Sequence, residues 1–163
     1  MKKIILTALI ILLLTMTGSY EAVIAADLKD NGNGTVTDKS TGLMWQQKDY
    51  GETAATREDV SLYCKKLELA GYKDWRLPTC EELLSIVDTT KSNPAINIIY
   101  FPDTKATYYW ASDIWGYFGS NPMFCIVDFK TGKSEGVYET NHPISGDGRS
   151  KCGRCVRAVK KLK

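Results

Sequence analysis

Histidine is nearly absent from this 163-residue sequence, in which His142 is the only one. A zinc centre built on Cys152 and Cys155 would need two further ligands, and zinc draws its ligands mainly from Cys and His. His142 stands in a Pro-containing segment with no identifiable nucleophile nearby in the sequence, so nucleophilic hydrolysis finds little support. No spacing of Asp and Glu singles out the carboxylate pair of a glycosidase. We therefore expect no metal, no cofactor and no catalytic residue.

Long apolar runs are also scarce. The only one covers residues 4–16, and its length of about 13 residues falls short of the ~20 that a membrane-spanning helix needs. Lys2 and Lys3 precede this run and small residues follow it, which predicts a signal peptide over residues 1–25 and no membrane span. No Cys lies near the cleavage point, so a lipid anchor is not expected. The exported product, periplasmic or secreted, is expected to be a single domain over residues 26–163 with its core at about 30–159.

Neither sign of charge dominates, because 21 basic residues face 19 acidic ones for a net charge of +2. This balance gives no indication of a nucleic-acid partner. Acidic residues are nevertheless missing from residues 149–163, a segment that contains seven basic residues. The C-terminal segment is therefore a candidate patch for binding anions.

The sequence contains five cysteines, an odd number. In an exported protein they are expected to form disulfides, at most two within the chain, and spacing alone does not decide which cysteines pair. Cys152 and Cys155 also form a C-x-x-C pattern, typical of redox enzymes and metal sites. A redox C-x-x-C normally opens a helix, whereas an alternating β-pattern follows here, so a catalytic dithiol is not favoured.

Local patterns predict the main elements. Turn clusters at 30–34 and 38–42 bound two short β-patterns and indicate a hairpin of residues 35–37 and 43–45. The first cluster is not an EF-hand calcium loop, because Gly occupies its third and fifth positions. Helical spacing predicts a helix over residues 56–70, and a capping box of Thr79 and Glu82 predicts a second helix after Pro78. Further β-patterns lie at 108–112, 125–129, 137–138 and 155–159. This order predicts an α+β fold with an antiparallel sheet.

Seven phrases of the sequence, in their order and spacing, are similar to a known bacterial family. They are DNGNGTVTD at 30–38, TGLMW at 41–45, YC at 63–64, LAGYKDWRLPT at 69–79, YWAS at 109–112, VDF at 127–129 and CVR at 155–157. Together they resemble the C-terminal domain of the Legionella collagen-like adhesin, over roughly residues 30–157. The resemblance implies a C-type-lectin-like fold with two helices, an antiparallel sheet, long loops and chain ends that lie close together.

The resemblance also implies a disulfide pairing. In C-type-lectin-like folds a long-range bridge joins the first helix to the last strand, and Cys64 and Cys155 match those two places. A bridge between Cys125 and Cys152 is a second candidate, which leaves Cys80 as the unpaired thiol. The Glu-Pro-Asn or Gln-Pro-Asp signature of calcium-dependent sugar binding has no match in this chain, so we do not carry over calcium binding.

The adhesin domain is associated with sulfated glycosaminoglycans, which contact proteins largely through Lys and Arg. By resemblance, the candidate ligands of a sulfated or anionic glycan are Arg149, Lys151, Arg154 and Arg157. The alternative interpretation is that Arg154 and Arg157 support the last strand. Trp115 and Tyr117 flank Gly116 in an expected loop and are candidates for stacking on sugar rings, whereas Trp110 is expected in the core.

These observations favour an exported, non-catalytic binding module that recognises a glycan or serves in adhesion. An envelope domain that binds another protein is the alternative. Formylglycine-generating enzymes share the general fold and use cysteines near the C-terminus, so Cys152 and Cys155 leave a thiol or copper enzyme as a third hypothesis.

Overall fold

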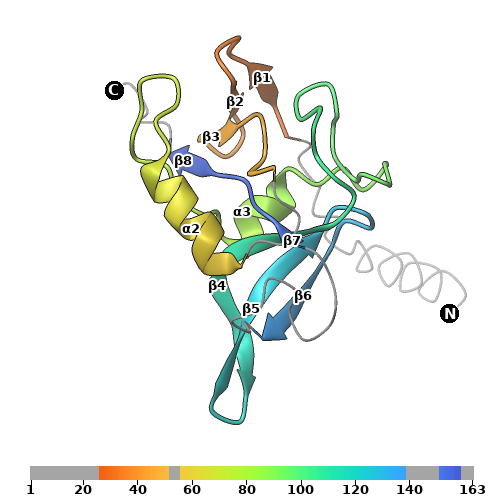
Figure 1. Cartoon of the computed structure of the whole chain (residues 1–163). Helices are drawn as coiled ribbons and strands as arrows, with labels where there is room; N and C mark the ends of the chain where they lie inside the picture. Colours follow the sequence, from red (N-terminus) through yellow and green to blue (C-terminus); the bar gives the residue numbers. More distant parts are fainter. Residues whose placement is uncertain (1–25, 52–55, 139–150, 159–163) are drawn as a thin grey trace, which may run out of the picture.

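The computed structural model describes residues 26–51, 56–138 and 151–158. Within these ranges the chain forms β1 (Leu28–Asp30), β2 (Thr35–Asp38), β3 (Leu43–Gln46), α2 (Arg57–Lys66), α3 (Cys80–Ser85), β4 (Tyr108–Phe118), β5 (Asn121–Asp128), β6 (Lys133–Tyr138), β7 (Lys151–Cys152) and β8 (Val156–Ala158). The strands form two sheets, in the orders β1-β2-β3-β8 and β6-β5-β4-β7 (Figure 1). All pairings are antiparallel except the short parallel contact of β4 with β7. The α+β prediction is confirmed, and the arrangement agrees with a C-type-lectin-like fold.

Both helices begin with a capping box, and the one at Thr79 was predicted. The Thr56 hydroxyl accepts a hydrogen bond from the Asp59 backbone N–H, and the Asp59 carboxylate accepts one from the Thr56 N–H. Thr79 and Glu82 form the same reciprocal pair at the start of α3. Each pair satisfies backbone donors that the first helical turn would otherwise leave unbonded.

The first helix ends at Lys66, earlier than the predicted residue 70. Leu67 is already extended, and Leu69 and Tyr72 exchange two backbone hydrogen bonds of 3.1 and 3.0 Å. This tight turn places Ala70 at a φ of +55°, outside the right-handed helical region. The apolar spacing of the sequence continues through residue 70, but the turn stops the helix one turn sooner.

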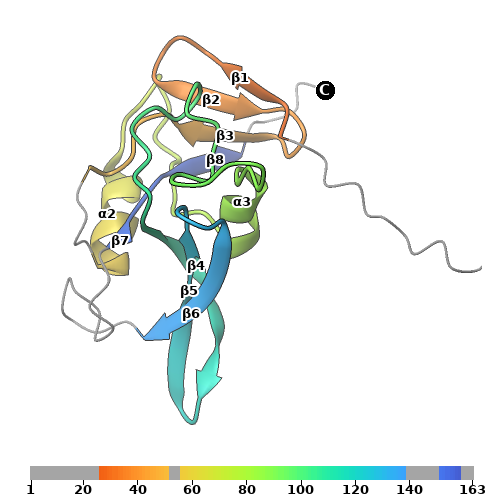
Figure 2. The same ribbon diagram turned by 90° about the vertical axis from the view of Figure 1, so that its right-hand side faces the viewer.

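The second sheet is buried on both faces in its central part, because alternate residues enter two separate core clusters. Tyr109 and Val127 join the cluster that contains Leu83 of α3. Trp110 and Ile126 point the other way. They join the cluster that contains Val60, Cys64 and Trp75. The two helices therefore cover opposite faces of this sheet, as Figures 1 and 2 show. The expectation of a buried Trp110 is confirmed.

The beginning and the end of the described chain meet in the first sheet. Val156 of β8 lies opposite Trp45 of β3, and its backbone also exchanges hydrogen bonds of 2.9 Å with Arg76. Just before β8, Cys155 is bonded to Cys64 of α2, the pairing that the resemblance implies. The last strand is thus held by a sheet partner, a loop and a covalent bond.

Several strands differ from the sequence prediction. β1 and β7 were not predicted, because strands of three and two residues are too short to show an alternation of apolar and polar residues. β4 continues to Phe118 instead of ending near residue 112, and β5 begins at Asn121. The added lengths pair with one another and form a hairpin that extends beyond the body of the domain (Figure 2).

Candidate functional site

Arg154, a candidate glycan contact, lies inside the molecule with 1% of its side chain exposed. Its Nη1 donates to the backbone carbonyl of Gln46 at 2.7 Å and also to that of Gln47. Its Nη2 donates to the Thr104 hydroxyl at 2.8 Å and lies 3.5 Å from a carboxylate oxygen of Asp103. The guanidinium group therefore joins the end of β3 to a distant loop, and its burial keeps it from contacting a surface ligand.

Arg157 is also buried and has internal partners. Its Nε and Nη2 donate to the two carboxylate oxygens of Asp74, at 2.7 and 3.1 Å. The guanidinium carbon lies 3.8 Å from the centroid of the Tyr72 ring. This two-point contact fixes β8 to the preceding loop. The expectation of ligand contacts at Arg154 and Arg157 is corrected: both arginines support the last strand. Arg149 and the side chain of Lys151 lie outside the described residues.

A groove of about 320 Å³ opens between the end of β3 and the last turns of α2. Its lining residues are Gly34, Gln46, Gln47, Lys48, Asp49, Tyr63, Leu67 and Leu69. Leu67 and Leu69 give it an apolar side, while the Gln46 amide donates to the Tyr63 hydroxyl at 2.5 Å and gives it a fixed polar side. We call this feature, together with the exposed lysines described next, the lysine groove.

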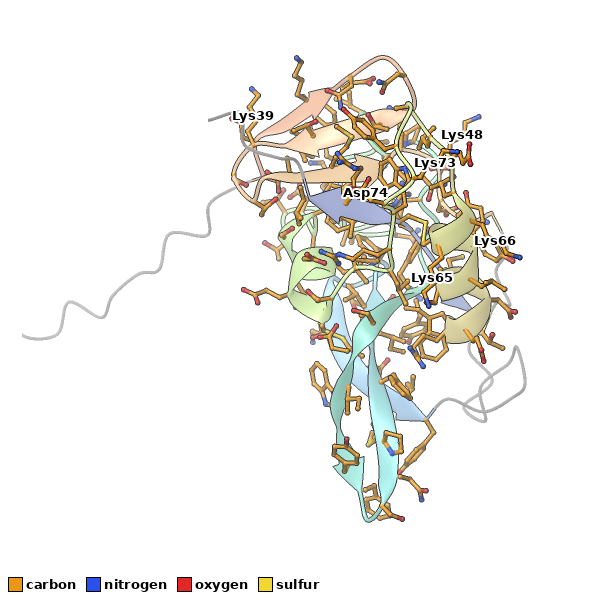
Figure 3. The ribbon with its side chains drawn as sticks, turned by 90° about the vertical axis from the view of Figure 1, so that its left-hand side faces the viewer. Lys39, Lys48, Lys65, Lys66, Lys73 and Asp74 are labelled. Atoms are coloured by element: carbon orange, nitrogen blue, oxygen red, sulfur yellow. A yellow bond between two sulfur atoms is a disulfide. The ribbon has the colours of Figure 1, made fainter. Side chains whose placement is uncertain are left out.

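Four exposed lysines lie on the elements that form the groove or on the segments next to them, and one of them, Lys48, lines it. Lys48 follows β3, Lys65 and Lys66 end α2, and Lys73 lies in the following loop. Figure 3 shows these four on one face of the molecule, with Lys39 at the opposite edge. Lys73 contacts Glu68 at 2.6 Å, whereas Lys48, Lys65 and Lys66 form no ion pair with any described residue. The face therefore carries an excess of positive charge.

Sequence reasoning missed this cluster because its lysines come from three separate segments. Only Lys65 and Lys66 are adjacent in the sequence, and cations in the last turn of a helix are common because they complement the helix dipole. The seven basic residues near the C-terminus were a stronger signal in the sequence. The two of them whose side chains are described, Arg154 and Arg157, are internal.

Trp115 and Tyr117 lie on the projecting hairpin, which consists of Ile114–Phe118 of β4, the turn at 119–120 and residues 121–123 of β5. We call it the aromatic arm. Trp115, Tyr117 and Phe118 are 50%, 66% and 72% exposed. The structure therefore places both predicted aromatic candidates at the surface, on a hairpin in place of the expected loop. The arm and the lysine groove are formed by different elements.

The second disulfide differs from the expected one. Cys80 is bonded to Cys125, and Cys152 is the free cysteine, so the Cys125–Cys152 pairing was wrong. Cys80 opens α3 against β5, and its Cα lies 5.9 Å from that of Cys125. Cys152 lies on β7, two strands away from β5. Two strand spacings are roughly 9.6 Å, beyond the ~7 Å that a disulfide can bridge between Cα atoms.

The Cys152 thiol is buried next to a polar cluster. Burial raises its pKa to about 11, and the negative charge of Asp49 contributes to the rise. Asp49 itself accepts a hydrogen bond of 2.6 Å from Tyr109, whose own pKa burial raises as well. A thiol held in its neutral form is a poor nucleophile and a poor metal ligand.

We expect no thiol of the native protein to react with a colorimetric disulfide reagent at pH 8, and one to react after unfolding in guanidinium chloride. The pKa of the Cys152 thiol is higher in the folded protein than in the unfolded chain. Between about pH 9 and pH 11 the thiol therefore loses its proton more readily in the unfolded chain, and the free energy of unfolding falls as pH rises. Thiol counts in both states and unfolding curves across this pH window test the prediction. Two or more thiols that react rapidly in the native protein would contradict it and favour the thiol-enzyme hypothesis.

No group of three or more His, Cys, Asp or Glu residues in the described ranges is arranged to hold a metal ion. No helix among those residues is long and apolar enough to cross a membrane. The described geometry is that of a small α+β domain with two disulfides, a surface groove with exposed lysines on the neighbouring segments, and an exposed aromatic hairpin.

The model of one family, the Lcl C-terminal domain, matches residues 34–157, which is most of the chain. The chain belongs to this family, as its resemblance predicted. A comparison with curated proteins gives no match. Family membership places the chain among adhesin-associated domains, and the two disulfides are compatible with an exported protein.

Proposed function

We propose that this domain binds an anionic polysaccharide, such as a sulfated glycosaminoglycan, in the lysine groove and performs no chemistry on it. The observation that carries the proposal is the position of Lys48, Lys65 and Lys66. Lys48 lines the groove, Lys65 and Lys66 end the helix that contributes Tyr63 to it, and no described acidic residue pairs with the three exposed lysines. Sulfate groups are fully charged at neutral pH, so unpaired ammonium groups on one face would attract and retain them.

The groove itself suits a sugar. Amide groups and a tyrosine hydroxyl provide hydrogen bonds to ring hydroxyls, and Leu67 and Leu69 provide contact for the apolar face of a ring. Gln46 is fixed on both sides, because its carbonyl side-chain oxygen accepts from the Cys155 N–H at 3.2 Å while its amide donates to Tyr63. A preorganised polar group loses little conformational entropy when a ligand binds.

A non-catalytic role fits the one acidic residue that lines the groove. One oxygen of Asp49 accepts from Tyr109 and the other accepts from the Gly51 N–H at 2.8 Å. Both oxygens therefore already have partners, and Asp49 as a residue is 8% exposed. A general acid or base must reach the proton that it transfers, and the internal hydrogen bonds of Asp49 leave its carboxylate poorly placed to reach a substrate in the groove.

Replacing Lys48, Lys65 and Lys66 together by Gln is expected to remove most of the retention on immobilised heparin at low salt. For protein contacts to nucleic acids, each neutralised phosphate contributes roughly 0.7 to 0.9 to the slope of log affinity against log salt, and we expect a similar contribution for each sulfate of heparin. The triple variant should therefore bind with a slope that is smaller by about two to three. Titration of soluble heparin at several salt concentrations measures both quantities.

The matched control removes the same charge elsewhere, by replacing Lys39, Lys130 and Lys133 with Gln. These exposed lysines lie at the β2–β3 turn and around the β5–β6 turn, away from the groove lining. The control variant should keep the native slope within about one. Equal losses in both triple variants would mean that net charge alone drives the retention. Loss only on charge reversal at Arg149 and Lys151 would move the site to the C-terminal segment.

A further inference from the structure

The aromatic arm has a charge pattern unlike that of the rest of the domain. The fourteen residues from Ile114 to Val127 include no charged side chain, and Asp113 and Asp128 stand at the two ends of this stretch. Asp113 accepts from the Cys80 N–H at the start of α3, at 2.9 Å, so its charge is directed toward the body. Among the described residues, the hairpin that projects from the body (Figure 2) is thus also a stretch without charged side chains.

The exposed side chains of the arm lie on both of its faces. Tyr117 pairs with Pro122 and Phe118 with Asn121, and successive residues of a strand point to opposite faces. Neither face packs on the domain core at this end, because Tyr117 and Phe118 belong to neither core cluster. Trp115 lies nearer to the body, where its ring packs on Gly136: a Cβ added to Gly136 would lie 2.4 Å from its Cδ1.

We propose that the tip of the aromatic arm inserts into the interfacial layer of a phospholipid bilayer. A second copy of the chain could cover one face or one edge of the arm but would leave the opposite face in water. A lipid layer surrounds an inserted tip on all sides, which matches apolar side chains on both faces. Insertion also requires that no charge loses its hydration, and residues 114–127 meet that requirement. Tyr and Trp are side chains that favour the boundary between headgroups and acyl chains.

The backbone limits how deep the arm can go. At its outer end the hairpin has only two strands, so backbone groups on its outer edges have no strand partner, and hydrocarbon would leave them without hydrogen bonds. Pro122 has no N–H, which reduces this cost at the tip by one donor. We therefore place Tyr117, Phe118 and Pro122 in the interfacial layer, at a depth of about 5–10 Å, with Trp115 near the headgroups.

The chain provides its own reporter for this insertion. Of its four tryptophans, Trp45, Trp75 and Trp110 are buried, and Trp115 alone is half exposed. Addition of phosphatidylcholine vesicles to the chain from Ala26 onward should shift the tryptophan emission to shorter wavelength. Lipids brominated near the headgroup should quench it, and both effects should disappear in Trp115→Phe. Because the proposal rests on apolar contact, binding should change less than about twofold between low and high salt, unlike heparin binding.

Replacing Tyr117 and Phe118 together by Ser should weaken vesicle binding roughly tenfold or more, since each ring loses an apolar contact. The matched control is Ile98→Ser with Ile99→Ser, another pair of adjacent, exposed apolar residues, on the loop before Phe101. This control should bind vesicles as the native chain does. The unfolding midpoint of both variants should stay near the native one, because none of these four side chains is buried.

Three results would overturn the proposal. No emission shift at millimolar lipid would exclude insertion. An emission shift that grows with protein concentration in the absence of lipid, together with a dimer in sedimentation, would show that a second copy of the chain covers the arm. A shift with neutral oligosaccharides but not with vesicles would assign the arm to sugar stacking. None of these results affects heparin binding by the lysine groove, so the two proposals fail separately.

Discussion

Replacing Cys64 and Cys155 together by Ala is expected to lower the free energy of unfolding by on the order of 4–5 kcal/mol. The bridge spans 91 residues of sequence, and a cross-link of that length removes much of the conformational freedom of the unfolded chain. Both cysteines are also fully buried, in the same core cluster as Val60 and Trp75. The loss of two packed sulfur atoms adds to the effect of the lost bond.

The bridge also fixes β8, a very short strand. β8 contains only three residues; β3 is its one strand partner, and two backbone hydrogen bonds join Val156 to Arg76. We therefore expect exchange of the Val156 amide hydrogen to become much faster in the double variant, beyond the change in global stability. Urea unfolding under non-reducing conditions and hydrogen exchange measure the two effects.

Cys152→Ala serves as the control, because it removes a buried thiol and no bridge. It should cost about 1 kcal/mol, the size of a small core truncation. The Cys80–Cys125 bridge spans 45 residues and provides a second comparison, with an expected loss of about 4 kcal/mol when both are replaced by Ala. A loss below about 1 kcal/mol for the Cys64 and Cys155 double variant would show that the bridge does not determine the stability of the fold.

Features that depend on a few neighbouring residues could be predicted from the sequence. The capping box at Thr79 and the hairpin of β2 and β3 are of this kind. Their hydrogen bonds join residues three to four positions apart or across one tight turn, so the residues concerned are visible in one phrase. The pairing of Cys64 with Cys155 became an expectation only through the resemblance to a family, since spacing left every connectivity open.

Features that depend on distant partners could not be predicted. Nothing near Arg154 indicates that it is internal, because its partners Gln46 and Thr104 are 108 and 50 residues away in sequence. The same is true of the lysine groove, whose cations come from segments that meet only in the folded chain. The aromatic arm had a local signal, the uncharged run from Ile114 to Val127, but a run of this kind is equally typical of a buried hairpin.

Arg154→Met is expected to destabilise the protein by about 3–5 kcal/mol, the range for removing one partner of a buried charged network. The substitution keeps much of the side-chain volume but removes the donors. The carbonyls of Gln46 and Gln47 and the Thr104 hydroxyl would then lose their hydrogen bonds from Arg154, and Asp103 would lose its nearest cation. Urea unfolding of the variant and of the native chain measures the difference.

Arg157→Met is the matched control, since it removes the same group from the same segment. The side chain of its partner Asp74 is 62% exposed, so water can hydrate the carboxylate when the arginine is gone. We expect a loss of about 1–2 kcal/mol, which includes the lost contact with the Tyr72 ring. Equal losses of unfolding free energy in the two variants would mean that the burial of Arg154 does not determine how much it stabilises the protein.

Heparin affinity distinguishes a structural role of Arg154 from a direct contact of Arg154 with the ligand. Gln46 and Gln47 line the lysine groove, and Arg154 holds their carbonyls in place from inside. If Arg154 has only a structural role, Arg154→Met should weaken heparin binding without changing the slope of log affinity against log salt, because no contact to the polyanion is lost. A slope that falls by about one, with unfolding unchanged, would instead return Arg154 to the surface site inferred from the sequence.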